Sequence, residues 1–239
     1  MLLTREAGGR VRDGFDTTGG KYFIAPASLD FLAVKQARSV PVMRAVIDAV
    51  MERLWSGDEA EIRIPDICRA TGVNYGSVYH HFGSREGVID AAYHQLFRDL
   101  VRDDLDAIAS IGERARDVGG YLELIRPLVS AMSAGEDRRR RRAMRARIVA
   151  ASLVRPELGE LIAVSQAEVH AVLTSLVAEG QVRGFLRRDV DSRALATVLQ
   201  SVLFGRVIDD VSSEPVSQVI WEDTVTTLLG ALVEPTPSS

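Results

Sequence analysis

Cysteine and lysine are scarce in this chain of 239 residues, and long apolar runs are missing. The single cysteine, Cys68, excludes an intrachain disulfide and a metal site made of cysteines alone. Such a composition is typical of a protein in a reducing compartment. No apolar run has the roughly 18 residues of a transmembrane helix, and the first residues lack the apolar core of a signal peptide. We therefore expect a globular, cytoplasmic protein with no membrane partner.

An excess of positive charge is also absent. The 29 lysines and arginines face 33 aspartates and glutamates, which leaves a formal net charge of −4. This balance excludes a strongly basic nucleic-acid coat protein and a binder of anionic membrane surfaces. It does not exclude site-specific DNA binding, because what matters there is where individual arginines lie.

The sequence lacks the motifs of the common enzyme classes as well. It has no glycine-rich dinucleotide or phosphate loop, no nucleophile elbow and no set of residues with metal-ligand spacing. His80 and His81 are adjacent, and adjacent side chains on a helix point about 100° apart, whereas chelation requires residues three or four apart. We expect no catalytic activity, no cofactor and no metal.

What the sequence has in abundance is helical periodicity. From residue 43 onward apolar residues recur every three or four positions, and no segment alternates as a strand does. Glycines and prolines separate the periodic stretches, and Pro127 predicts a kink or break inside one of them. The pattern indicates an all-α protein of about nine helices. They are expected at about 41–56, 65–71, 75–82, 85–108, 122–134, 136–154, 157–179, 191–203 and 216–233.

The two ends differ from this helical body. Residues 1–38 contain two glycine pairs and six basic against four acidic residues. We therefore expect a locally positive extension that is partly disordered. Residues 234–239 form a short tail, a glutamate followed by prolines, a threonine and serines, that we expect to be frayed.

Residues 64–82 carry the most specific pattern. Apolar residues are spaced so that two short helices pack together, Gly72 provides a tight turn between them, and Asn74 is a favourable cap for the second helix. The second helix presents hydroxyls, imidazoles and a glycine that lets the backbone approach another molecule. This is the chemistry of a helix that reads the major groove of DNA. The residues presented are Tyr75, Gly76, Ser77, Tyr79, His80 and His81.

Residues 64–86 resemble the signature of the tetracycline-repressor (TetR) family of bacterial transcription regulators, and the resemblance extends over about residues 42–100. A later segment, 184–191, resembles the loop before the family's eighth helix. The positions that match the signature are Ile67, Gly72, Val73, Gly76, Ser77, Val78, Tyr79, Phe82, Ser84 and Glu86. The positions that depart from it are Arg63, Cys68, Thr71, Asn74, Arg85 and Gly87.

The resemblance implies a fold, partners and a mechanism. A three-helix head with the helix-turn-helix motif, residues 39–85, would bind DNA, and residues 86–233 would bind an effector and dimerise. Two protomers would pair their last two helices in a four-helix bundle and place two recognition helices in successive major grooves, about 34–36 Å apart. The implied partners are double-stranded operator DNA, a second copy of the chain, and a small hydrophobic or amphipathic effector that releases a repressor from its operator.

Site residues follow from the resemblance and from the side-chain pattern. The residues expected at DNA are Arg44, Arg63, Asn74, Tyr75, Gly76, Ser77, Tyr79, His80 and Arg85. The residues proposed for the wall of an effector pocket are Ile125, Met132, Met144, Ile148, Gln166, Val169, His170 and Phe204. Gln166 and His170 are four residues apart and share a helix face, so they are also compatible with a satisfied polar pair in a core or interface.

The charge of the head leaves the function open to alternatives. Between residues 39 and 90 five arginines face eight carboxylates, so a protein-interaction module that has lost DNA binding is a rival to a regulator. An activator and an effector-free regulator are further alternatives. The positive extension 1–38 either contacts DNA or is an unrelated tail.

A run of arginines has two alternative roles. Residues 138–142 are all arginine, and Arg145 and Arg147 follow on the same expected helix. The run either binds an anionic effector or DNA, or it is a solvated helix start that pairs with Glu136, Asp137 and other acidic neighbours.

Overall fold

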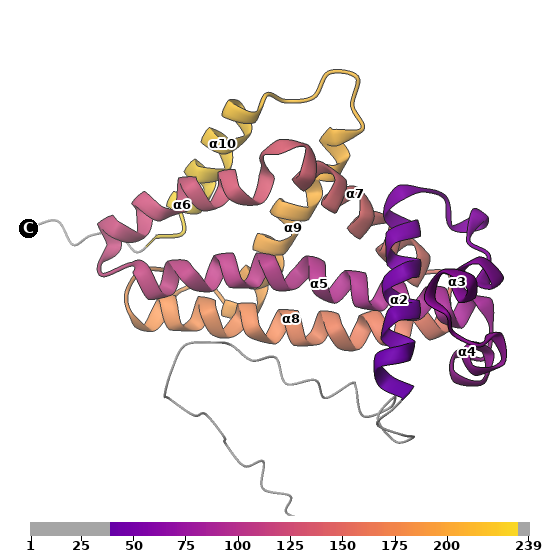
Figure 1. Ribbon diagram of the computed structural model, residues 1–239. Helices are drawn as coiled ribbons and strands as arrows, with labels where there is room; N and C mark the ends of the chain where they lie inside the picture. The colour runs from indigo at the N-terminus through magenta and orange to yellow at the C-terminus, as the bar shows by residue number, and fades with distance from the viewer. Residues whose placement is uncertain (1–38, 234–239) are drawn as a thin grey trace, which may run out of the picture.

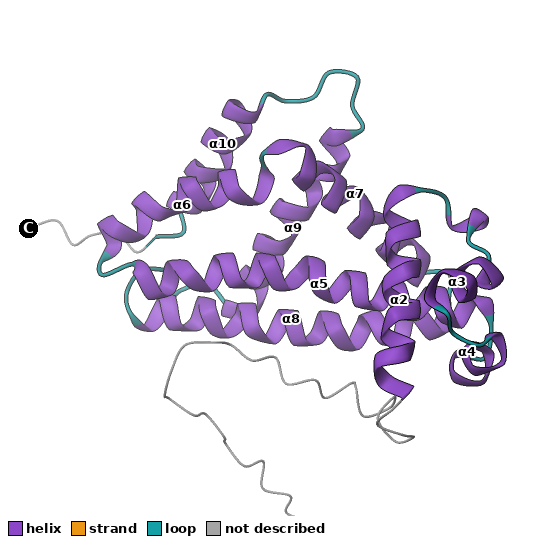
Figure 2. Cartoon of the chain, in the orientation of Figure 1, coloured by secondary structure: helices purple, strands orange, loops and turns teal. Residues whose placement is uncertain are grey.

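The structure is a computed structural model that describes residues 39–233. Within these residues the chain forms nine α-helices and one short 3-10 helix, η1, and its β-pairing is limited to one bridge between Leu186 and Val233 (Figures 1 and 2). The all-α prediction is confirmed, whereas the predictions for 1–38 and 234–239 lie outside the described residues. The helices are α2 Ser39–Ser56, η1 Glu59–Glu61, α3 Ile64–Thr71, α4 Tyr75–Phe82, α5 Arg85–Arg114, α6 Val118–Ser133, α7 Gly135–Ser152, α8 Pro156–Val182, α9 Ser192–Asp210 and α10 Gln218–Gly230.

Several helices begin at capping residues that the sequence supplies. The side chain of Asn74 accepts a hydrogen bond from the N–H of Gly76 at 2.8 Å, and the Ser84 hydroxyl accepts one from the N–H of Gly87 at 2.9 Å. Asp191 caps α9 in the same way. Each bond satisfies a backbone donor that has no partner inside its own helix.

Two predicted helix breaks do not occur, and the kink predicted at Pro127 stays a prediction. Helix α6 runs unbroken through Pro127, where the ring and Glu123, whose carbonyl loses its usual partner, both lie on the exposed face of the helix. Helix α8 continues through Gly180 to Val182. Gly180 is buried there, and a Cβ atom on it would lie 3.0 Å from Leu186 Cδ1. This glycine therefore serves close packing and does not end the helix.

The helices form a head and an elongated body (Figure 1). Helices α5 and α8 lie side by side and run in the same direction, because Arg155 bonds to Asp90 near one end while Arg183 donates to the Gly112 carbonyl at the other. Helix α9 packs on α8, and α6 pairs with α10 above them. Helices α2, α3 and α4 gather at the N-terminal end of α5.

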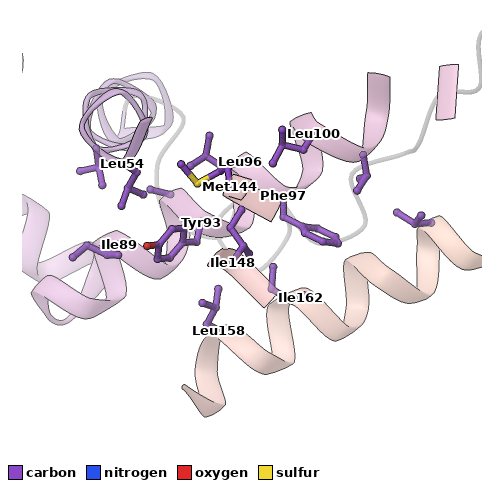
Figure 3. Close-up of a cluster of buried hydrophobic side chains, with 14 of the residues drawn as sticks. Leu54, Ile89, Tyr93, Leu96, Phe97, Leu100, Met144, Ile148, Leu158 and Ile162 are labelled. Carbon is purple, nitrogen blue, oxygen red and sulfur yellow. The ribbon is translucent and has the colours of Figure 1, made fainter. Parts of the chain in front are cut away.

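One continuous core joins the head to the body. Buried side chains extend from α2 through the α3–α4 pair into α5, α7 and α8, with Tyr93, Phe97 and Ile148 near the middle (Figure 3). A second, smaller cluster lies between α6 and α10 around Ile125 and Val225. The head is therefore built on the same packed interior as the body, since α5 contributes to both.

Helix α8 is long and apolar enough to cross a membrane by length and composition alone, which no other described helix is. In the structure it packs against α5, α7 and α9, and its buried side chains, among them Leu158, Leu173 and Val177, belong to the continuous core. This packing accounts for part of its apolar composition, and Leu161, Val164 and Val182 of the same helix are exposed.

Candidate DNA-binding interface

The α3–α4 pair has the geometry of a helix-turn-helix. Ile67 and Val78 are almost fully buried between the two helices and α5, and Val73 fills the turn. Gly72 ends α3 with φ = 71°, a left-handed conformation that glycine adopts without steric cost. The apolar residues that the sequence places inside are thus the ones that fix α4 on the head.

The outward side of α4 carries the residues predicted at DNA. Tyr75, Gly76, Ser77 and His80 are exposed, and Tyr79 is half-buried with its ring centroid 4.5 Å from that of Tyr75. A hydrogen bond with Tyr75 and partial burial raise the pKa of Tyr79, so its hydroxyl keeps its proton at neutral pH. The face therefore presents hydroxyl donors and an imidazole in one short stretch.

Asn74 and Gly76 have a structural role beside any contact with DNA. The Asn74 side chain already caps α4, and a Cβ atom on residue 76 would lie 3.1 Å from Asn74 Oδ1. A larger residue at 76 would crowd this cap. The two positions keep the start of the helix open to another molecule.

The two adjacent histidines have different surroundings. His80 is exposed on the face of α4, whereas the ring of His81 packs edge-on against Phe82 with 4.6 Å between centroids. Burial, together with the neighbouring His80, lowers the pKa of His81. His81 is therefore a neutral packing residue, and His80 is the one available to a partner.

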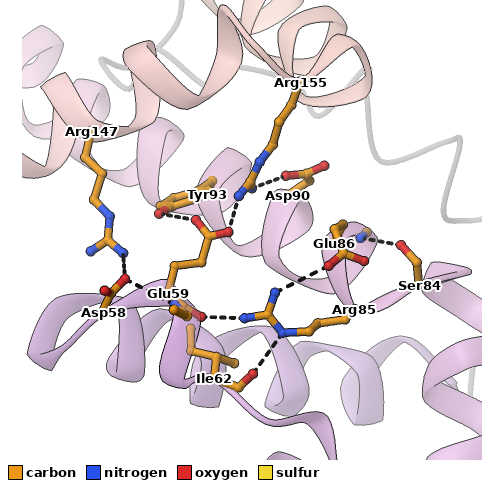
Figure 4. Close-up of polar contacts among 12 residues, drawn as sticks. Asp58, Glu59, Ile62, Ser84, Arg85, Glu86, Asp90, Tyr93, Arg147 and Arg155 are labelled. Carbon is orange, nitrogen blue, oxygen red and sulfur yellow. Dashed lines mark hydrogen bonds and ion pairs between the residues drawn. The ribbon is translucent and has the colours of Figure 1, made fainter.

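The three predicted arginines also differ. Arg44 donates from Nε to Asp48 at 2.8 Å on the exposed side of α2. Arg63, just before α3, is exposed and makes no ion pair with any residue from 39 to 233. Arg85 donates to the carbonyls of Ile62 at 2.9 Å and Glu59 at 2.5 Å (Figure 4). A phosphate contact from Arg85 would have to compete with these bonds, whereas Arg63 is available.

Sequence reasoning missed a polar network where the head meets the body, the junction cluster of Glu59, Asp90, Tyr93, Arg147 and Arg155 (Figure 4). Arg155 donates to Asp90 at 2.8 Å and also to Glu59, which in turn accepts a hydrogen bond from the Tyr93 hydroxyl at 2.9 Å. Arg147 donates to the carbonyl of Gly57 at 3.2 Å. No signal in the sequence relates these positions, because they come from four separate segments.

The junction cluster is partly withdrawn from water. Burial and the adjacent Glu59 raise the pKa of Tyr93 to about 12. Burial also raises the pKa of Asp90, although Arg155 opposes this effect. The guanidinium groups of Arg147 and Arg155 lie 5.8 and 5.7 Å from the centre of the Tyr93 ring. Charge and ring packing therefore fix the start of α8 against η1.

An apolar cavity of about 110 Å³ lies in the body, between the continuous core and the α6–α10 cluster. Its wall is formed by α5, α6, α8, α9 and α10 and is almost entirely aliphatic, with Tyr121 and Arg183 among its few polar residues. Tyr121 stacks on Phe185 with 5.5 Å between ring centroids. We call this space the apolar cavity.

The residues predicted for an effector pocket divide into three groups. Ile125 and Met132 line the apolar cavity, and Phe204 lines a smaller one beside it. The others line neither cavity. Met144, Ile148 and Val169 belong to the continuous core, Gln166 donates to Gln200 at 2.6 Å, and His170 lies 3.5 Å from the Thr197 hydroxyl.

Comparisons with known proteins agree with this fold. Residues 47–92 match the model of bacterial regulatory proteins of the tetR family, and residues 122–233 match that of the C-terminal region of BetI-type transcriptional repressors. The transcriptional regulator UidR of Escherichia coli K12 is 19% identical over 183 residues, which are 77% of this chain and 88% of UidR.

Solved structures show the same architecture. A TetR-family regulator from Mesorhizobium loti superposes with a TM-score of 0.61 at 18% identity, over 82% of this chain and 96% of its own. A regulator from Saccharomonospora viridis in complex with choline has a TM-score of 0.56 at 18% identity, over 84% of this chain and all of its own. The two family models together match more than half of the sequence. One covers the helix-turn-helix and the other covers the helical body, so the chain is a transcriptional regulator of the TetR family.

Proposed function

We propose that the chain is a cytoplasmic, homodimeric repressor that a small hydrophobic or amphipathic ligand releases from a near-palindromic operator. The observation that carries the proposal is that α5 serves both sites. The continuous core fixes α4 on the N-terminal part of α5, and later residues of the same helix line the apolar cavity. In this assignment residues 39–85 read DNA, and residues 86–233 bind the ligand and the second protomer.

DNA contacts divide between α4 and the arginines around it. We assign contacts with bases and phosphates to Tyr75, Ser77, Tyr79 and His80. They lie exposed or half-buried on the outward side of α4, and Gly76 lets the backbone approach closely. Arg44 and Arg63, with the cap residue Asn74, serve the phosphates. About half or more of protein–DNA hydrogen bonds go to the backbone and set the register, so these contacts position α4.

The last two helices support dimerisation. They expose Val198, Ile208, Val219, Ile220 and Leu228 on their surfaces. The buried side-chain polar atoms without a hydrogen-bond partner among the described residues also lie on these two helices, on Gln200, Arg206, Trp221 and Thr226. A second copy of the chain would cover this apolar surface, as in the four-helix bundle that the family resemblance implies.

Ligand binding is coupled to DNA through α5 and α8. Ile108 and Ile111 of α5 line the apolar cavity, while Asp90 and Tyr93 of the same helix belong to the junction cluster. A ligand that separates α6 from α5 and α8 would displace Arg155 and Asp90 relative to Glu59 and so change the tilt of α4. Such a ligand releases DNA only if it binds the displaced state more tightly.

Duplex binding with the full chain tests the proposal. The probe is the DNA flanking the chain's own gene, measured by fluorescence anisotropy at low salt and checked by footprinting. Tyr75→Ala and His80→Ala are expected to weaken operator binding about tenfold or more, because a base contact contributes about 1–3 kcal/mol. Glu123→Ala, an exposed change on α6 far from the head, is the control.

Two results would contradict DNA recognition by α4. One is a wild-type chain that binds no duplex at low salt. The other is a Tyr75→Ala variant with wild-type operator affinity. An unchanged melting temperature for each variant ensures that a loss of binding comes from the missing side chain and not from unfolding.

A further inference from the structure

The arginine run pairs with carboxylates of other helices, so the predicted pairing with acidic neighbours is confirmed. Glu136 and Asp137 are not among its ion-pair partners within residues 39–233, so these two predicted partners are wrong. Arg138 donates to Asp104 at 2.7 Å, and Arg141 donates to Asp103 at 2.6 Å. Arg142, which is buried, binds both oxygens of Asp210 at 2.7 and 2.8 Å. Arg138, Arg141 and Arg142 therefore lie toward α5 and α9, whereas Arg139 and Arg140 of the same run are exposed.

A second cavity, the arginine cavity, lies at this place. It measures about 30 Å³ and is lined by Arg138, Arg141, Arg142 and Arg145, with Asp104 as the acidic side chain in its wall. Three carboxylates, those of Asp103, Asp104 and Asp210, pair with these four guanidinium groups. One positive charge at the cavity is left without a carboxylate of its own.

Arg145 is the guanidinium with unused donors. Its side chain is 16% exposed and lies between the rings of Phe97 and Phe204, 5.8 and 5.5 Å from their centres. Its ion pair is the long one, 3.7 Å to Asp104, and within residues 39–233 it makes no hydrogen bond. A guanidinium has five N–H donors, and those of Arg145 are not among the buried atoms without a hydrogen-bond partner, so they remain accessible. An anion in the cavity can therefore take the place of water as their acceptor.

The arginine cavity adjoins the apolar cavity. Met132 and Leu203 line both, so these two flexible aliphatic side chains form the partition. A molecule that displaces them would place an apolar body in one space and a head group in the other. At roughly 10–15 Å³ per water, the arginine cavity holds about two waters, which suits a carboxylate and is too small for a nucleotide or a sugar phosphate.

We propose that the ligand of this regulator is an amphipathic carboxylate, with its apolar body in the apolar cavity and its carboxylate on Arg145. The inference rests on the proposed function, in which the apolar cavity binds the effector. A carboxylate pairs with guanidinium in a planar, charge-assisted arrangement. The same arginines repel a quaternary ammonium such as the choline bound by the Saccharomonospora viridis regulator, so this chain differs from that protein in ligand charge.

Two probes with the same alkyl chain and different polar groups separate the contributions of the two cavities to binding. Octanoate and 1-octanol are titrated against the full chain by displacement of N-phenyl-1-naphthylamine, a neutral apolar fluorophore. The wild type is expected to bind octanoate at least tenfold more tightly than octanol. Arg145→Met is expected to remove this preference and to leave octanol binding unchanged. The matched control is Arg140→Met, an exposed arginine of the same run that lines neither cavity.

Asp104→Asn gives a gain that misfolding cannot imitate. Asp104 competes with a ligand for Arg138 and Arg145, so its neutral amide is expected to tighten octanoate binding severalfold with no change for octanol. If Arg145→Met also weakens octanol binding, the effect of Asp104→Asn on octanoate binding decides whether the carboxylate site exists.

The outcomes separate the two proposals. Equal binding of both probes by the wild type, or an octanoate preference that survives Arg145→Met, overturns the carboxylate site and leaves the apolar cavity as the effector site. A chain from which neither probe displaces the fluorophore overturns ligand binding in the apolar cavity itself. DNA binding by α4 is measured separately and is independent of both results.

Discussion

His94 shows how a single residue can make the stability of this protein depend on pH. It sits on α5 facing α8, where its Nε2 atom lies 2.8 Å from the Ser165 hydroxyl, and Ser165 is almost fully buried. Burial, with a smaller contribution from Arg98, lowers the pKa of His94 from 6.5 to about 4. The folded chain therefore holds this imidazole neutral over a range in which the unfolded chain binds a proton.

Acidification is expected to destabilise the fold through His94. Between pH 6.5 and about 4 the unfolded state binds more protons, so stability falls as pH falls through this window. The loss from pH 7 to pH 5 is about 2 kcal/mol, at 1.36 kcal/mol per pKa unit. Urea unfolding at both pH values measures it. His94→Gln retains a side-chain donor for Ser165 and is expected to lose most of this pH dependence; an equal slope in both proteins would contradict the assignment.

At the scale of single residues, the sequence predicted which side chains are exposed better than it predicted their hydrogen-bond partners. Tyr75, Ser77 and His80 are exposed as expected, because an amphipathic short helix leaves polar groups no other place. Arg85 was expected at phosphate but donates to backbone carbonyls of the head. The partners of an arginine depend on which helices meet, and its long side chain reaches too many candidates for spacing to decide.

At the scale of secondary-structure elements, Gly87 fixes how α4 connects to α5. It departs from the family signature, and the structure explains why a glycine stands there: a Cβ atom would lie 2.1 Å from the Phe82 carbonyl oxygen. Its N–H donates to the Ser84 cap of α5. The tight connection between α4 and α5 therefore depends on the missing side chain.

Gly87→Ala is expected to destabilise the chain by about 1–3 kcal/mol, because backbone must move to relieve the overlap. Gly112→Ala is the matched control, since it lies in the same helix with no atom within 4 Å of its added Cβ. That change is expected to be neutral or to stabilise by up to about 1 kcal/mol through helix propensity. Thermal melts compare the two. Equal effects from both substitutions would show that the close contact at residue 87 is absent.

Helix positions could be predicted from the sequence because caps and apolar spacing are local. Asn74, Ser84 and Asp191 mark helix starts where they were expected. Pro127 and Gly180 were expected to end a helix and do not. Pro127 and the Glu123 carbonyl that lacks its usual partner are on the exposed face, and Gly180 is kept inside α8 by close packing against Leu186. These opposing effects are properties of the tertiary fold.

At the scale of the molecule, dimerisation is the feature to test first. Ile220 on α10 is 60% exposed, and Leu153 at the end of α7 is 81% exposed but lies outside the proposed dimer surface. Ile220→Glu is expected to convert the dimer to monomer at micromolar concentration, because it places a charge in an apolar interface. Leu153→Glu is expected to remain dimeric. Sedimentation velocity distinguishes the two, and identical sedimentation of both variants would place the interface elsewhere.

The sequence could not predict which apolar residues line a cavity. Ile125 and Met132 were proposed for a pocket and line one, but Met144, Ile148 and Val169 share their chemistry and lie in the packed core. Apolar composition does not distinguish a filled interior from a hollow one. The difference arises from how far the α6–α10 pair stands from α5 and α8, which only the assembled fold determines.

The continuous core also bears on how this regulator can be re-engineered as a sensor. Sensors are assembled by exchanging DNA-reading heads between regulators, with the cut placed at the end of the head. In this chain a cut after Arg85 would leave Val46, Val50 and Val78 to pack on a foreign α5. In the reverse exchange, Arg147 and Arg155 would meet foreign residues in place of Gly57 and Glu59. A workable exchange therefore transfers the first three turns of α5 together with the head, and matches the incoming residues at positions 57–59 to these two arginines.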